Sequence, residues 1–211
     1  MLRFLSILAA AAVVCLLLVT WIASLGVWPF ADRSGDQFAS CRSSAVAGGV
    51  GQIGGPFSLR DSGGKTVTDA DVITAPSLVY FGYTFCPDVC PMDTIRNAEA
   101  VDVLEENGEM VTPIFISIDP GRDTPEMVEQ YVAAIHPRMI GLTGSADQVK
   151  AASRAYRTYY KVHDSSDEYY LVDHSTFTYL VLPEHGVVEF FRRDVNPEVM
   201  AEKSACFIDK I

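Results

Sequence analysis

The sequence predicts an α/β domain with a mixed sheet, preceded by a single N-terminal transmembrane helix. A long apolar run opens the chain, with no charged residue between Phe4 and Ala31. Beyond it, short apolar runs of strand length alternate with segments of helical period, which is typical of an α/β domain. Two further strand-like runs joined by a turn then follow, and such a hairpin adds antiparallel strands to the sheet.

Residues 1–30 are predicted to form an uncleaved membrane anchor. The apolar run from Phe4 to Trp28 fills 25 positions, whereas a helix needs roughly 20 to cross the hydrocarbon core and a cleaved signal peptide has only about 7–15 apolar residues. Trp21 and Trp28 lie toward its far end, where aromatic rings favour the interface. Arg3 is the only charged residue before the run, so we expect the rest of the chain outside the cytoplasm.

The composition indicates a folded acidic domain behind a polar linker. Hydrophobic residues make up 49% of the chain and charged residues 20%, which excludes a disordered protein. The formal charge of −11 becomes −12 for residues 31–211 once Arg3 is subtracted, and such a surface repels nucleic acid. Residues 31–47 are small and polar and are predicted as a linker, which leaves residues 48–211 as the domain.

Each element of the domain follows from a local pattern. Phe57–Arg60 and Lys65–Thr68 flank Asp61-Ser-Gly-Gly, which predicts an N-terminal β-hairpin. The apolar runs 77–83 and 111–118 are typical of strands buried on both faces. The remaining expected elements are, in order, a helical turn at 69–74, a helix at 88–107, a helix capped by Thr124, a strand at 139–144, a helix capped by Ser145, strands at 169–172, 176–182 and 187–191, and a final helix opened by Asn196-Pro197.

The helix expected at 88–107 has an apolar residue every three or four positions, and Asn107-Gly108 ends it. This spacing predicts that one face packs on the sheet. The residues expected on that buried face are Met92, Ile95, Ala98, Val101 and Leu104.

The pair Cys86 and Cys90 follows the first buried strand. Ligands collect at the carboxyl ends of strands in an α/β sheet, so chemistry is expected here. Pro87 suits the first helical position, which would make Cys86 a cap or near-cap residue and favour its thiolate form. The two cysteines are four positions apart, about one helical turn, so both sulfurs can face one side. Two thiolates favour a soft metal such as Cu(I) or Zn.

His174 is the candidate third ligand, at the junction with a predicted core strand. His136 is expected at the surface or as a helix cap, and His163 and His185 in polar turns. A hydrogen-bonded structural role for His174 stays open. The cysteine pair also leaves alternatives: a redox dithiol, although three residues separate the cysteines instead of two; a structural zinc site, which lacks a fourth ligand; and a peroxidase assisted by Arg122.

Three other cysteines remain. Cys15 lies in the predicted anchor and is expected to be an inert apolar residue. Cys41 and Cys206 would face an oxidising compartment and could form a disulfide that ties the chain ends together. The sequence alone does not decide whether they pair.

Three segments resemble the Sco/SenC family of copper chaperones. They are Gly82-Tyr-Thr-Phe-Cys-Pro-Asp-Val-Cys-Pro91, Ile116-Ser-Ile-Asp-Pro-Gly-Arg-Asp-Thr-Pro125 and Val172-Asp-His-Ser175, in the family's order and spacing. The resemblance implies a thioredoxin-like fold and one copper ion per chain, Cu(I) or Cu(II), bound by Cys86, Cys90 and His174. The segment with Asp119 matches a family loop near the site, without a ligand role.

The resemblance implies a metallochaperone, not an enzyme, that helps assemble the binuclear copper centre of cytochrome c oxidase subunit II. Alternatives are a thiol:disulfide oxidoreductase that keeps the cysteines of that centre reduced, and a redox or copper sensor. A periplasmic copper donor and a thiol-disulfide reductant are expected partners. No Arg- and Ser-rich transit segment precedes the anchor, which favours a bacterial inner membrane with the domain in the periplasm over a mitochondrial inner membrane.

Overall fold

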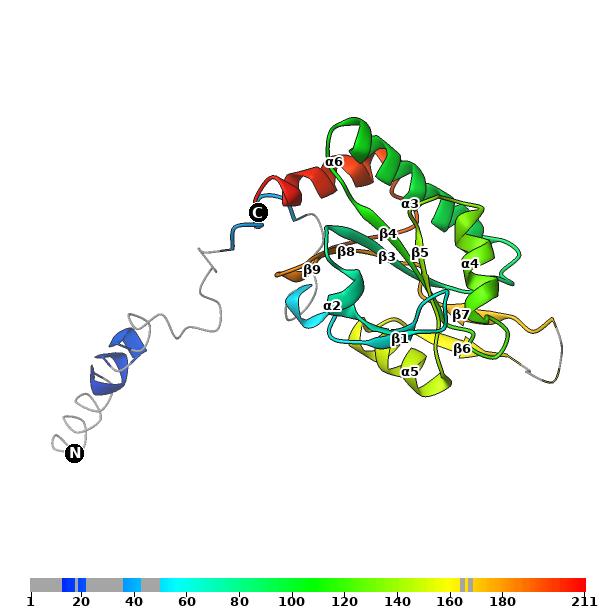
Figure 1. The fold of residues 1–211 in the computed structure, drawn as a ribbon. Helices are drawn as coiled ribbons and strands as arrows, with labels where there is room; N and C mark the ends of the chain where they lie inside the picture. The colour runs from blue at the N-terminus through cyan, green and yellow to red at the C-terminus, as the bar shows by residue number, and fades with distance from the viewer. Residues whose placement is uncertain (1–12, 18, 22–35, 43–49, 164–165, 167–168) are drawn as a thin grey trace, which may run out of the picture. The chain divides into compact units, whose positions relative to one another are not determined.

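The computed structural model describes residues 13–17, 19–21, 36–42, 50–163, 166 and 169–211 (Figure 1). Its elements in order are η1 (Val50–Gln52), β1 (Ser58–Arg60), β2 (Thr66–Thr68), α2 (Asp69–Val72), β3 (Ser77–Gly82), α3 (Val89–Glu106), β4 (Thr112–Ser117), α4 (Pro125–Ala133), β5 (Ile140–Leu142), α5 (Ala146–Ala155), β6 (Tyr160–Val162), β7 (Val172–His174), β8 (Thr178–Leu182), β9 (Gly186–Phe191) and α6 (Pro197–Ile208).

The predicted anchor lies largely outside the described residues. The chain divides into two units, 1–37 and 38–211. In the first unit, residues 13–17 and 19–21 are helical. Among the residues that the structure describes, no helix is both long enough and apolar enough to span a membrane. The anchor at 1–30 therefore stays a prediction, as does the boundary at residue 48.

The second unit has a five-stranded mixed sheet in the order β5-β4-β3-β8-β9. Strands β3, β4 and β5 run parallel, while β8 is antiparallel to both β3 and β9. All six residues of β3 are buried, as the apolar run predicted. The expected mixed α/β domain and its N-terminal β1–β2 hairpin are both present.

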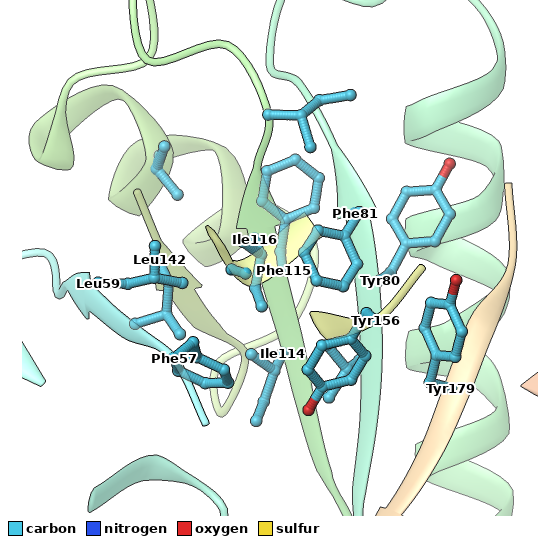
Figure 2. Packing of buried hydrophobic residues seen from close by; sticks show 14 of the residues in the cluster. Phe57, Leu59, Tyr80, Phe81, Ile114, Phe115, Ile116, Leu142, Tyr156 and Tyr179 are labelled. Atoms are coloured by element: carbon cyan, nitrogen blue, oxygen red, sulfur yellow. The ribbon is translucent and has the colours of Figure 1, made fainter. Parts of the chain in front are cut away.

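The sheet has a hydrophobic core on each face. On one face, Leu78 and Leu180 belong to the cluster that contains Val101 of α3 and Phe207 of α6. On the other face, rings pack under β1 and α5, and Figure 2 shows Phe81 beside Tyr156 and Tyr179. Tyr80 lies on the opposite side of β3 from Phe81, toward α3 (Figure 2). Alternation along one strand thus supplies both cores and points Tyr80 at the helix that follows Cys86.

The helix caps read from the sequence are present. Thr124 accepts a hydrogen bond from the Met127 N–H before α4, and Pro125 occupies the first turn. Ser145 forms a capping box with Gln148 at the start of α5. Asn196 caps α6 through the Val199 N–H. Each cap satisfies a backbone donor that the first helical turn leaves without a partner.

The predicted helical position of Pro87 and the predicted strand at 169–172 are wrong. Helix α3 begins at Val89 with Asp88 as its N-cap, so Pro87 precedes the helix and Cys86 lies near the cap without being the cap residue. The strand expected at 169–172 begins instead at Val172 and ends at His174. It pairs with β6, a short strand that the sequence did not indicate, in the register Tyr160↔His174. Pairing with β6, not local β propensity, decides where β7 lies.

The face that α3 buries also differs from the prediction. Met92 and Ile95 are 60% and 46% exposed, whereas Asp93 and Asn97 are buried in their place. Cys90 is fully buried on the same side as Asp93, because residues three apart share a helix face. The first turns of α3 are therefore oriented by Cys90 and polar partners, while Ala98, Val101 and Leu104 are buried as expected.

Part of the expected linker packs on the domain. Phe38 is buried and its ring contacts the ring of Phe207, with centroids 5.5 Å apart. In the structure, Cys41 and Cys206 form a disulfide whose Cα atoms are 5.7 Å apart. This bond attaches the segment before η1 to α6, near the end of the chain.

Candidate metal centre

Two segments distant in sequence supply the three predicted ligands. Cys86 lies in the loop after β3, Cys90 in the first turn of α3, and His174 at the end of β7. The two Sγ atoms and one imidazole nitrogen all lie within 4.8 Å of one another. No other group of at least three His, Cys, Asp or Glu side chains in the described part of the chain is so close. The structure thus brings together the three residues that the sequence singled out.

The two cysteines have opposite electrostatic environments. Both are free thiols. A hydrogen bond from the Cys90 thiol, helped by the Cys90 N–H, lowers the pKa of Cys86 to about 3. The Cys90 N–H lies 3.4 Å from Cys86 Sγ. The same hydrogen bond to Cys86, together with burial, raises the pKa of Cys90. In the metal-free state the pair therefore shares one proton, with the thiolate on Cys86.

His174 is oriented by its second ring nitrogen. Its Nδ1 lies 2.9 Å from the Ser175 carbonyl oxygen, which can only accept a hydrogen bond. Nδ1 therefore carries the proton in the neutral ring, and the lone pair belongs to Nε2. Nε2 lies 3.2 Å from Cys90 Sγ. A backbone carbonyl is one of the usual hydrogen-bond partners that orient a metal-binding histidine in this way.

Aromatic rings enclose the histidine. Tyr80 and Tyr83 meet the His174 ring edge-on, with centroids 6.2 and 5.9 Å away. The Tyr80 hydroxyl donates to the buried carboxylate of Asp93 at 3.1 Å and lies next to Cys90. Burial raises the pKa of Asp93, and the neighbouring Arg96 opposes that rise. Tyr80 thus links the innermost sulfur to the polar side of α3.

A buried carboxylate holds the loop that carries Cys86. Asp123 accepts hydrogen bonds from the Thr84 N–H at 3.0 Å and the Thr84 hydroxyl at 2.6 Å. It also accepts one from the Ser117 hydroxyl at the end of β4. Gly82, at the end of β3, leaves room for the Cys90 sulfur, since a Cβ there would lie 3.1 Å from Cys90 Sγ and 2.9 Å from the Tyr80 ring. The cysteine loop is therefore fixed at both β3 and β4.

The other candidate residues lie elsewhere or act differently. His136 is buried beside Asp102 and accepts from the Arg138 N–H, so the expected surface position is wrong. His163 pairs with Asp173, and the ring of His185 contacts Phe38. Arg122 donates to Asp119, whose carboxylate also accepts a hydrogen bond from Tyr170. Both oxygens of Asp119 are therefore engaged, and Asp119 is not one of the candidate metal ligands.

Sequence reasoning missed the residues around the ligands, chiefly Tyr80, Tyr83, Asp93 and Tyr170. One signal was available for Asp93. It lies three positions after Cys90, so any helix that turns Cys90 inward also turns Asp93 inward. Nothing in the spacing of the tyrosines distinguishes them from ordinary core residues.

The chain is similar to known proteins over most of its length. A family model described as SCO1/SenC matches residues 46–209. The chain belongs to the SCO1/SenC family. Protein SenC of Rhodobacter capsulatus, another SCO1/SenC relative, is 52% identical over 176 residues, which cover 83% of this chain and 79% of that protein.

Solved structures of SCO1/SenC relatives share the fold. The crystal structure of Arabidopsis thaliana ScoI with copper bound is 42% identical, with a TM-score of 0.71, and the match covers 74% of this chain and 99% of that one. The structure of Bradyrhizobium japonicum ScoI with copper bound is 37% identical, with a TM-score of 0.65 and coverage of 72% and 98%. These matches confirm the expected thioredoxin-like fold.

Proposed function

We propose that this protein is a copper chaperone that binds one copper ion through Cys86, Cys90 and His174. One observation carries the proposal: the Nε2 lone pair of His174 is directed by the Ser175 carbonyl to within 3.2 Å of Cys90 Sγ, beside the Cys86 thiolate. Two thiolates and one imidazole suit Cu(I) and also accommodate Cu(II). Two similar proteins, Arabidopsis thaliana ScoI and Bradyrhizobium japonicum ScoI, have structures with copper bound.

The burial of the ligands suits delivery of the metal. Cys90 is fully buried, Cys86 is 8% exposed and His174 is half-buried, so the outer side of the group is formed by Cys86 and His174. No fourth Cys, His, Asp or Glu joins them among the described residues. A thiolate of a partner protein can then approach from the outer side and take the ion by stepwise ligand exchange, with Cys90 released last.

The recipient that we propose is the binuclear copper centre of cytochrome c oxidase subunit II, which the family resemblance implies. This protein would receive its copper from a periplasmic donor, and a thiol-disulfide reductant would keep Cys86 and Cys90 reduced. The anchor at residues 1–30 would hold the protein in a bacterial inner membrane with its domain in the periplasm. The Cys41–Cys206 disulfide supports such an oxidising compartment.

Replacing His174 with alanine tests the proposal in cells. In a strain that lacks this protein, we expect the wild-type chain to restore copper in subunit II and oxidase activity. His174→Ala should restore less than about a tenth of that activity, since removal of a ligand costs more than the 10–100-fold loss typical of its hydrogen-bond partners. The measurement is oxidase activity together with copper content of the purified oxidase.

His185→Ala is the matched control, because His185 lies in the β8–β9 turn and contacts Phe38. It should restore activity as well as the wild type does. Full oxidase assembly with His174→Ala would show that the ligand assignment is wrong.

A second function, thiol:disulfide oxidoreduction, is favoured by the Cys86 thiolate beside the protonated Cys90 thiol. The thiolate would attack a partner disulfide, and Cys90 would then release the partner as a dithiol, leaving a Cys86–Cys90 disulfide. Two electrons pass to the partner. The His174→Ala variant separates the two functions, because copper delivery needs the imidazole and disulfide exchange does not.

A further inference from the structure

Arg122 occupies an unusual position beside the cysteine loop. Its Nε donates to Asp119 at 2.6 Å, and the Arg122 side chain is only 13% exposed. The guanidinium carbon lies 3.5 Å from the centre of the Tyr170 ring and 4.8 Å from that of Phe85. It is also 5.8 Å from the centre of Tyr83. One cation thus lies within about 6 Å of the centres of three aromatic rings, the range of a cation–π contact.

These rings belong to the two segments that supply the copper ligands. Tyr83 and Phe85 flank Thr84 immediately before Cys86, whereas Tyr170 lies just before β7, which ends at His174. A second link between these segments is the hydrogen bond of 3.4 Å from the Val172 N–H to the Tyr83 hydroxyl, across 89 positions of sequence. Arg122 therefore lies at the junction of the cysteine loop and the histidine strand.

Asp119 completes the link. Its carboxylate is almost fully buried and accepts from Arg122 on one oxygen and from the Tyr170 hydroxyl, at 2.5 Å, on the other. The Arg122–Asp119 pair alone spans only three positions and would hold no more than its own loop. Because Tyr170 bonds to the same carboxylate and stacks on the same guanidinium, the pair also holds the segment that leads to His174. A planar guanidinium can both stack and donate in this way, and an ammonium cannot.

Resting on the proposed function, we propose that Arg122 is a positioning residue of the copper site, which holds the His174 strand against the cysteine loop so that the imidazole is in place before the metal arrives. It does not touch the metal. Without Arg122, the two sulfurs still bind Cu(I), but the third ligand must be ordered when copper binds. The cost of ordering then lowers the affinity.

A double-mutant cycle tests this on the full-length chain. Cu(I) affinity is measured by competition with a chromophoric Cu(I) chelator for wild type, Arg122→Ala, His174→Ala and the double variant. We expect Arg122→Ala to lower the affinity about tenfold, as loss of a ligand's supporting contact typically does. In the Arg122→Ala background, His174→Ala should have a several-fold smaller effect than in the wild type, because the imidazole already contributes less. Nitrogen hyperfine coupling from His174 in the Cu(II)-loaded chain should weaken in parallel.

Arg138→Ala is the matched control, since Arg138 also makes an ion pair of 2.6 Å, with Glu105, and donates to the Val111 carbonyl before β4 begins. It should change neither the affinity nor the cycle. If Arg122→Ala does not fold, Arg122→Lys replaces it, with the same direction expected because stacking is lost while the charge is kept. An equal effect of His174→Ala in both backgrounds would overturn the role of Arg122 and leave the proposed function intact. No effect of His174→Ala in the wild type would overturn the proposed ligand set itself.

Discussion

Replacing Cys90 with serine is expected to lower the affinity for Cu(I) by more than about a hundredfold, because loss of a ligand exceeds the 10–100-fold cost of losing its hydrogen-bond partner. Cys90 is fully buried and lies 3.2 Å from His174 Nε2. A serine hydroxyl is a hard donor and stays protonated, so it cannot replace a soft thiolate at this position. Competition with a chromophoric Cu(I) chelator measures the change.

The same variant should remain folded, because serine fits the space of cysteine and its hydroxyl can bond to Tyr80. Chemical denaturation of the copper-free chain checks this. Cys15→Ser is the control, since Cys15 is a free cysteine outside the three-ligand group. Unchanged Cu(I) affinity in Cys90→Ser would contradict the proposed site.

Of the substitutions proposed for this protein, removal of the Cys41–Cys206 disulfide is expected to lower the free energy of unfolding most. The bond closes a loop across 165 positions of sequence. Such long loops restrict the unfolded chain strongly, and native disulfides typically contribute about 2–4 kcal/mol. The double variant Cys41→Ala/Cys206→Ala should therefore unfold with a free energy lower by about this amount. Urea denaturation without reductant measures it.

Reductant provides the control for this prediction. It should lower the unfolding free energy of the wild type toward that of the double variant and leave the double variant unchanged. The wild type and the double variant should bind Cu(I) with the same affinity, because the disulfide joins α6 to the segment before η1 and does not involve the ligand segments. A loss below about 0.5 kcal/mol, the range of ordinary surface substitutions, would show that the disulfide does not stabilise the fold.

The sequence predicted those parts of the fold that depend on local chemistry. The apolar runs predicted the positions of β3 and β4. The helices expected to begin after Thr124, Ser145 and Asn196 are capped by those residues. Cys86 and Cys90 were placed at the end of a buried strand because strand ends and cysteine spacing are both visible in the sequence. His174 was a candidate ligand because of its place in the segment Val172–Ser175, and the structure brings it to the two sulfurs.

The missed features depend on contacts between distant segments. Strand β6 forms because it pairs with β7, and its own three residues carry no distinct signal. Met92 and Ile95 are exposed because Cys90 and Asp93 must face Tyr80, an interaction that hydrophobic periodicity does not register. Phe38 packs in a stretch expected to be linker because Cys41 bonds to Cys206. Arg122 was noted only as a conceivable partner of a reactive cysteine, and its contacts lie with Asp119 and Tyr170 instead.

Copper X-ray absorption on the full-length chain, loaded with Cu(I) and freed of excess metal, tests the proposed ligand set of Cys86, Cys90 and His174. We expect one copper per chain with two sulfur neighbours and one nitrogen neighbour, and loss of the nitrogen neighbour in His174→Ala. A copper coordinated by sulfur alone in the wild-type chain, or a spectrum unchanged by His174→Ala, would contradict that ligand set.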